Sequence, residues 1–367
     1  MIYIKNNYFS KKKHITMNAK KLPKLFLLLV FLIAVSCSKT EDNVPLTSPT
    51  AQITVDEIVR EASLVNQEIP FKIINEQGED VTSTAMFYVD GELIDGTSFM
   101  SSTIGEFEVY GVYTEDGVEI TTNTEPFRVI IPKRKIVVED YTGTWCGFCP
   151  RVAGAIQSLE TETHDIAVVA IHETANSFPD PMHFDQIELL KGAFNVEGLP
   201  AARINRTTDW ALPHANSDIT SIAGLDTNLA IAIYSQLTGS DLLVQLNVVY
   251  ENGSSQGDKL VVYLLEDGII NDQVNYYNDD NTSPFYQLGD PIPNFVHNDV
   301  LRNSLSDVLG DPIPNTEALT EYITSYSISI PSEYNTANLS IVAMIVDENN
   351  NAKNAQVADL EEDKSYE

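Results

Sequence analysis

The hydrophobic pattern of the chain changes twice after the N-terminal segment, and the first region reads as β structure. Between residues 51 and 132, short runs of alternating apolar residues are separated by turn signals. The pairs Asp90–Gly91 and Asp116–Gly117 each stand between two such runs. Asp-Gly between strand-like runs indicates a hairpin, and several short strands at this spacing are typical of a small β-sandwich. We therefore expect an all-β domain over 51–132.

The pattern then predicts an α/β unit. KIVVEDY at 135–141 and DIAVVAIHE at 165–173 are apolar runs of the kind found in buried strands. Between them, Val152, Ile156 and Leu159 keep helical spacing. An apolar strand, a helix and a second apolar strand predict a parallel βαβ unit. A further helix over 183–196 and a strand over 198–207 complete the α/β domain expected at 133–228.

From residue 229 to 367 the pattern indicates strands again, so a C-terminal β-rich domain is expected. The last elements of the α/β domain are ambiguous. Either residues 217–238 supply a final helix and strand, or the later β segments form that edge of its sheet. The predicted fold class is an α/β core flanked by two all-β domains.

The N-terminal segment has the pattern of an export signal. Its first 36 residues hold seven lysines and no acidic residue, and an apolar run extends from Leu25 to Val35. Eleven residues are too few for a membrane-spanning helix, which needs about 20, so a signal peptide over 1–36 is predicted. A start at Met17 would give a signal of more ordinary length. Ala34 to Cys37 resembles a bacterial lipobox, which implies lipidation of Cys37, and the polar residues 37–50 are expected to form a tether.

The charge of the chain excludes some partners. The formal net charge is -31, and removal of the seven lysines leaves 15 basic against 53 acidic residues, or -38. Such an acidic surface repels nucleic acid and anionic lipid, so neither is expected to bind through charge. Attachment to a membrane is therefore expected to come from the lipid anchor.

Two of the three cysteines, Cys146 and Cys149, form a C-x-x-C motif between the predicted strand and helix. In an exported protein beside a βαβ pattern, this is a thioredoxin-like redox signature. The free N–H groups and dipole of a helix N-terminus favour a thiolate. Cys146 is the expected nucleophile, and Cys149, placed one turn into the helix, is expected to attack the mixed disulfide and release the substrate.

Three other interpretations of the pair compete with the redox site. A structural zinc site needs about four ligands, and only two thiols remain once Cys37 is lipidated, so no metal or other cofactor is expected. A purely structural disulfide closes too short a loop to stabilise the fold much. The third alternative is a redox fold kept as a scaffold for binding, since a fold alone does not guarantee its chemistry.

The residues around the pair make it more specific. Trp145 to Pro150, WCGFCP, resembles the W-C-G-x-C motif of thioredoxin-like proteins. This resemblance implies that Asp140 is the buried acid that accepts the proton of Cys149, although Glu139 stands beside it. It also implies that Pro200 is a cis-proline that orients an extended substrate, and that Trp145 forms an apolar lip. The implied partners are protein or peptide thiols and disulfides.

Two longer motifs resemble one family. Residues 139–151, EDYTGTWCGFCPR, and the later segments 262–268 and 296–302 match hallmarks of the twenty-eight-kilodalton outer-membrane-protein family of lipoproteins. The resemblance implies an outer-membrane or surface lipoprotein with a thioredoxin-like core. His297 and Arg302 lie in its second motif and are expected to be a satisfied pair at a domain junction. The first region resembles bacterial immunoglobulin-like modules, with GEFEVY at 105–110 as a late strand.

Two functions follow from these observations. The first is a thiol–disulfide oxidoreductase at the outer membrane that uses Cys146, Cys149 and Asp140. The alternative is a binding or adhesion lipoprotein in which the thioredoxin fold is a scaffold.

Overall fold

The computed structural model describes residues 52–54, 62–175 and 177–367 of the chain. The predicted signal peptide over 1–36, the lipidation site Cys37 and the tether over 37–50 lie outside these residues. Among the residues that are described, no helix is long and apolar enough to cross a membrane.

The N-terminal region is built of strands, as the alternating pattern predicts. A six-stranded sheet has the order β2-β10-β8-β5-β6, with β9 paired to β8, and β1-β4 and β3-β7 form two short pairs. Asp90–Gly91 joins β5 to β6 and Asp116–Gly117 joins β8 to β9, and each pair has positive φ angles, so both predicted hairpins are confirmed. The strands are β1 Gln52–Thr54, β2 Ala62–Leu64, β3 Ile69–Pro70, β4 Lys72–Ile74, β5 Met86–Val89, β6 Glu92–Leu93, β7 Ser98–Phe99, β8 Gly105–Glu115, β9 Val118–Thr121 and β10 Glu125–Ile130, with a 3-10 turn at Thr82–Thr84.

A nine-stranded sheet forms the centre of the remaining chain. Its order is β14-β13-β11-β12-β20-β17-β23-β24, with β21 paired to β17. Strands β11 and β12 are parallel, and β13 lies antiparallel on the other side of β11. The strands are β11 Ile136–Thr142, β12 Ile166–His172, β13 Ala201–Ile204, β14 Thr208–Asp209, β17 Lys259–Glu266, β20 Val300–Ser304, β21 Asp311–Pro312, β23 Leu339–Val346 and β24 Ala352–Asp359.

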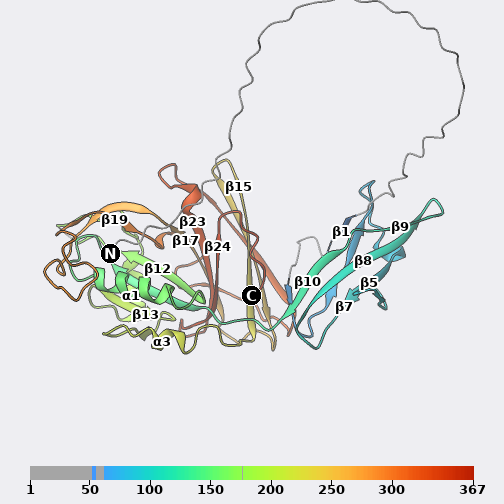
Figure 1. The fold of residues 1–367 in the computed structure, drawn as a ribbon, viewed down its shortest axis with the longest axis horizontal. Coiled ribbons are helices and arrows are strands. Elements are labelled where there is room, and N and C mark those ends of the chain that lie inside the picture. Colours follow the sequence, from blue (N-terminus) through green and yellow to red (C-terminus); the bar gives the residue numbers. More distant parts are fainter. Residues whose placement is uncertain (1–51, 55–61, 176) are drawn as a thin grey trace, which may run out of the picture. The chain divides into compact units, whose positions relative to one another are not determined.

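The apolar runs in β11 and β12 arise because helices cover both faces of this part of the sheet. Helix α1, Pro150–Glu160, lies on one face (Figure 1). Its residues Val152, Ile156 and Leu159 pack against the sheet there. Helix α2, Ile187–Phe194, packs on the other face. Successive strand residues point to opposite faces, so both alternating sets must be apolar. The third helix, α3 Ser217–Thr220, is a single turn.

The edge of the α/β unit is completed by the later β segments. Strand β20 pairs parallel with β12 at Ala170 and Val300, and β17 and β23 extend the sheet antiparallel. The residues after α3 join a different sheet of order β15-β16-β22, made of Leu229–Thr238, Asp241–Tyr250 and Glu321–Ser329. Of the two alternatives left open by the sequence, the second therefore describes the fold. The regions 133–228 and 229–367 share one sheet.

The three-stranded sheet covers one face of the shared sheet. Its apolar residues pack with Leu260, Val262 and Leu264 of β17, whereas Val261 and Tyr263 of the same strand face the core with α2. The predicted fold class, a thioredoxin-like α/β core flanked by β-rich regions, is confirmed.

A two-stranded arm leaves the C-terminal region and reaches the α/β unit. Strands β18, Ile269–Gln273, and β19, Ile292–His297, pair antiparallel. The loop between them begins beside the C-x-x-C segment, where Val274 N donates to Thr144 O at 2.8 Å. The arm therefore brings residues more than 120 positions away in sequence to the cysteine pair.

Candidate functional site

Cys146 and Cys149 form a disulfide at the N-terminus of α1. Strand β11 ends at Thr142, the chain turns, and Cys149 is the residue that caps α1 ahead of Pro150. Proline suits this first helical position because its missing N–H would have no partner there. The helix begins after the second cysteine, so the expectation that Cys149 lies one turn into the helix is wrong. Only 5% of Cys146 and 1% of Cys149 is exposed.

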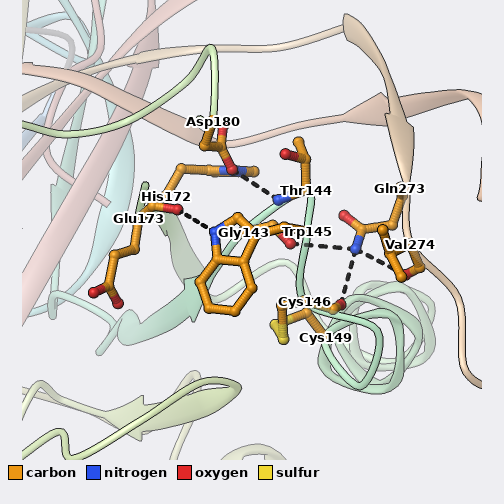
Figure 2. The surroundings of a disulfide bond; sticks show 10 residues. All are labelled: Gly143, Thr144, Trp145, Cys146, Cys149, His172, Glu173, Asp180, Gln273 and Val274. Carbon is orange, nitrogen blue, oxygen red and sulfur yellow. Dashed lines mark hydrogen bonds and ion pairs between the residues drawn. A yellow bond between two sulfur atoms is a disulfide. The ribbon is translucent and has the colours of Figure 1, made fainter. Parts of the chain in front are cut away.

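The residues before the disulfide are held by hydrogen bonds to the segment that follows β12 (Figure 2). Trp145 Nε1 donates to the Glu173 carbonyl oxygen at 2.7 Å. The Thr144 amide donates to Asp180 Oδ2 at 2.7 Å, and the same oxygen lies 3.0 Å from His172 Nδ1. The half-buried indole of Trp145 is thus fixed beside the disulfide, in the place that the thioredoxin resemblance implied for an apolar lip.

Asp180 remains a carboxylate in this network. Burial raises its pKa, but the hydrogen bond and charge of His172 and the amides of Thr144 and Met182 together outweigh burial, so the pKa is lowered overall. The sequence pattern did not single out His172 and Asp180. Their only local signal is the position of His172 at the end of a buried strand.

Asp140 lies behind the disulfide, on the face of the sheet that α1 covers. It lines a cavity together with Cys149, and 4% of the residue is exposed. Burial raises the pKa of its carboxyl group to about 8, and its Oδ1 atom has no hydrogen-bond partner. Glu139 points to the opposite face, where Oε1 accepts from Arg206 Nε at 3.0 Å. Of the two adjacent acids, the structure therefore brings Asp140 to the cysteines.

The cavity behind the disulfide has a volume of about 60 Å³. It lies between α1, the ends of β11 and β12, and the segment from β19 to β20. Beside Cys149 of the disulfide, its lining holds ionisable residues from all of these elements: Asp140, Glu160, His172, His297 and Asp299. Among the described residues, no group of three or more His, Cys, Asp or Glu side chains is arranged to hold a metal ion.

A strap formed by residues 273–277 crosses the outside of the cysteine loop. Gln273 Nε2 donates to the carbonyl oxygens of Gly143 and Cys146 at 3.2 and 3.0 Å (Figure 2). The amide of Tyr276 donates to Gly147 O at 2.9 Å, and its ring fills the space where a side chain at Gly147 would lie. The strap therefore covers the loop in part, and no motif in the sequence indicated this.

Pro200 precedes β13, at the same end of the sheet as the cysteine loop. The Leu199–Pro200 peptide bond is cis. Ala201, the next residue, pairs with Tyr141 of β11, and β11 leads directly into the C-x-x-C loop. The proline, Asp140, Trp145 and the two cysteines are therefore gathered at one end of the α/β unit.

His297 and Arg302 do not form the satisfied pair expected from the second motif. The His297 ring lies 5.2 Å from the ring of His172, and its Nε2 atom is buried without a partner. Arg302 faces Glu266 at 3.3 Å and lies over the ring of Tyr334. The two residues belong to different strands with different neighbours, because β19 ends at His297 and β20 begins at Val300.

Comparison with known proteins agrees with this architecture. Residues 118–209 match the thioredoxin family, and residues 187–364 match the family described as outer membrane protein Omp28. No curated protein sequence matches the chain. Among solved structures, HBP35 of Porphyromonas gingivalis is 18% identical with a TM-score of 0.48, over 64% of this chain and 77% of that one. A β-glucosidase from Kluyveromyces marxianus in complex with glucose is 9% identical with a TM-score of 0.19, over 85% and 47% of the two chains.

The fold and the family matches define an outer-membrane protein with a thioredoxin-like domain. More particularly, residues 187–364, which hold the motifs at 262–268 and 296–302, are similar to the Omp28 family, and the motif at 139–151 lies in the thioredoxin match.

Proposed function

We propose that the protein is a thiol–disulfide oxidoreductase of the outer membrane. The observation that supports this most is the disulfide between Cys146 and Cys149 at the N-terminus of α1, with the unpaired carboxyl of Asp140 behind it. The free N–H groups at the helix start stabilise a thiolate more than a thiol. A buried carboxyl with a raised pKa exchanges protons near neutral pH, as a resolving thiol requires.

Each residue has a distinct role in this proposal. The Cys146 thiolate attacks a substrate disulfide, and a mixed disulfide forms as the substrate thiolate leaves. Cys149 gives its proton to Asp140 and attacks Cys146, which releases the second substrate thiolate and restores the protein disulfide. Trp145 and Pro200 border the site and bind the substrate segment. The substrates are protein or peptide thiols and disulfides.

Trapping of mixed disulfides tests this function. Cys149→Ser protein incubated with envelope extract is expected to form adducts through Cys146 that a reductant releases, whereas Cys146→Ser protein forms none. The purified wild-type protein, equilibrated in glutathione buffers, is expected to show a potential between about -120 and -270 mV. No adducts, together with a potential below about -300 mV, would mark a structural disulfide and reject the oxidoreductase.

A scaffold role is the second candidate, and one observation favours it. Only 5% of Cys146 is exposed while the strap is in place, which limits attack on a bulky substrate. A protein that uses the fold only for binding or adhesion keeps its ligand when both cysteines are changed to serine. Loss of ligand capture in the Cys146→Ser/Cys149→Ser variant would count against this candidate.

The remaining parts fit an exported lipoprotein. We infer that residues 1–36 are a signal peptide, that Cys37 carries a lipid, and that residues 37–50 tether the folded part to the outer membrane. The N-terminal β region over 51–132 would then act as an immunoglobulin-like spacer. Radiolabelled palmitate incorporation into wild-type protein, and its absence in Cys37→Ser, is the corresponding test of the anchor.

A further inference from the structure

Two buried polar atoms without partners belong to residues that line the same cavity behind Cys149. These atoms are Asp140 Oδ1 and His297 Nε2, and the two residues are only 4% and 6% exposed. An unpaired polar atom in a protein interior costs free energy unless water or a ligand bonds to it. A cavity needs only about 10–15 Å³ to hold a water molecule, so about 60 Å³ is enough. The two unpaired polar atoms and the sufficient volume make this cavity a site for bound water.

The side chains around the cavity favour movement of a proton through it. Burial, and to a smaller extent the neighbouring His172, lower the pKa of His297 to about 4, although Asp180 and a backbone hydrogen bond to Asn271 oppose this. The ring is therefore neutral at pH 7 and has a free lone pair. Asp140, with a pKa of about 8, is mostly protonated at that pH and must pass on a proton before it accepts another.

Two further carboxyls in the lining of the cavity are more exposed to solvent than Asp140 and His297. Asp299 is half-buried, and burial, Asp267 and Glu160 raise its pKa well above its usual range. Glu160, near the end of α1, is exposed and lines the same cavity. Beside Cys149, the lining thus offers the carboxyls of Asp140, Glu160 and Asp299 and the imidazoles of His172 and His297.

We propose that His297, together with water bound between it and Asp140, forms the proton exit of the redox site. This inference rests on the proposed oxidoreductase function. When Cys149 resolves a mixed disulfide, its thiol proton goes to one oxygen of Asp140, and the proton already on that carboxyl moves through water to His297 Nε2. The Cys149 thiolate then bonds to Cys146 Sγ, and the bond from Cys146 to the substrate sulfur breaks. The substrate leaves as a thiolate, and the imidazolium loses its proton to solvent.

Loss of a proton exit should slow the resolution step without changing the redox equilibrium of the protein, and glutathione exchange measures both quantities. Reduced protein mixed with oxidised glutathione releases one glutathione when Cys146 attacks and a second when Cys149 resolves. His297→Ala is expected to slow the second release about 10-fold or more at pH 7, since a positioned acid or base typically contributes at least that factor. The first release and the equilibrium with glutathione should stay unchanged. Added imidazole, which fits the space left by the ring, should restore the second rate.

Two further variants sharpen the test. His164→Ala changes an exposed histidine away from the cavity and should leave both releases unchanged. His297→Gln is close to histidine in size and keeps an acceptor, but its amide cannot carry the proton, so it should slow the second release without rescue by imidazole. This variant also replaces His297→Ala if the smaller side chain prevents folding.

The outcomes distinguish the inference from the function on which it rests. Normal exchange by the wild type with an unchanged second release in both His297 variants overturns the proton exit alone. A parallel change in rate and equilibrium, without rescue, would assign His297 a purely structural role and also overturn it. A wild-type protein that forms no mixed disulfide with glutathione would overturn the oxidoreductase and this inference together.

Discussion

Two buried aspartates near the disulfide differ because their neighbours differ. Asp180 accepts from His172 and two backbone amides, so its charged form is the stable one. Asp140 has no such donors, and burial favours its neutral form. The same residue type thus favours its charged form at one position near the disulfide and its neutral form at the other. Such a pair, separated by environment alone, is typical of sites that move protons.

The raised pKa of Asp140 predicts a pH-dependent loss of stability. The folded-state pKa of about 8 exceeds the usual value of 3.8. Burial of Asp140 therefore costs no stability below about pH 4, where the carboxyl is protonated in the folded and unfolded states, and the loss of stability grows up to about pH 8. Asp140→Asn removes a charge that must otherwise be buried. Its free energy of unfolding, relative to wild type, should rise by up to about 1.4 kcal/mol per pH unit in this interval. Urea unfolding of the oxidised proteins at pH 5, 6.5 and 8 measures the difference.

Asp180→Asn is the matched control, because the pKa of Asp180 is lowered. The stabilisation from that carboxylate is complete above its unfolded pKa and is lost only as the pH falls through the lower folded value. The control should therefore be less stable than wild type by a constant amount between pH 5 and 8. Parallel profiles for Asp140→Asn and wild type would show that Asp140 is charged or hydrated in the folded protein.

At the scale of elements, the strap lies against the cysteine loop and covers it in part. Gln273 is 3% exposed, and its amide donates to two loop carbonyls, while the Tyr276 ring packs edge to face against Phe148 with ring centroids 5.0 Å apart. The amides of Val274 and Tyr276, which donate to the carbonyl oxygens of Thr144 and Gly147, also hold the strap along the loop. The arm that carries the strap is a two-stranded hairpin, which is only marginally stable by itself.

Loosening the strap should make the disulfide more reactive. A Cβ at residue 147 would lie 2.4 Å from the Tyr276 ring, so Gly147→Ala must displace this ring from the loop. Gln273→Ala removes two hydrogen bonds to the loop, worth about 1 kcal/mol each. Both variants should be reduced by dithiothreitol about 5- to 30-fold faster, as followed by the fluorescence of Trp145. Gly192→Ala, with nothing within 4 Å, is the control. Unchanged rates in both variants would mean that the strap already opens freely.

The residues of the site that are close together in the sequence can be predicted from it, whereas the residues that distant strands contribute cannot. The strand, the C-x-x-C turn and α1 are local, so apolar periodicity and the motif locate Cys146, Cys149 and Asp140. Gln273 and His297 reach the site through pairings across more than 120 residues. No period within a single strand indicates which distant strand it will join. The position of β20 beside β12 depends on such a pairing in the same way.

At the scale of the whole sheet, a buried ion pair joins the α/β unit to the C-terminal strands. Arg206 and Glu139 are fully buried, and their Nε and Oε1 atoms lie 3.0 Å apart. Arg206 also donates to Tyr263 of β17 at 2.9 Å and to the Val308 carbonyl oxygen at 3.0 Å. Tyr141 donates to the second oxygen of Glu139. Each partner thus has several bonds that would be lost together, which links the two regions into one folding unit.

Breaking this ion pair should destabilise the whole shared sheet. Arg206→Met leaves Glu139 as an unpaired buried charge, so the free energy of unfolding should fall by about 3–5 kcal/mol. The double variant Arg206→Met/Glu139→Leu removes both charges and should recover most of the loss. Lys133→Ala, which breaks an exposed pair with Asp226, should cost at most about 1 kcal/mol. Denaturant unfolding, followed by tryptophan fluorescence and by circular dichroism, should give one coincident transition in each case.

If Arg206→Met splits the transition in two while the double variant does not, the ion pair supplies the coupling between the regions. An Arg206→Met loss no larger than that of Lys133→Ala would instead show that apolar packing across β12, β20 and β17 holds them together unaided.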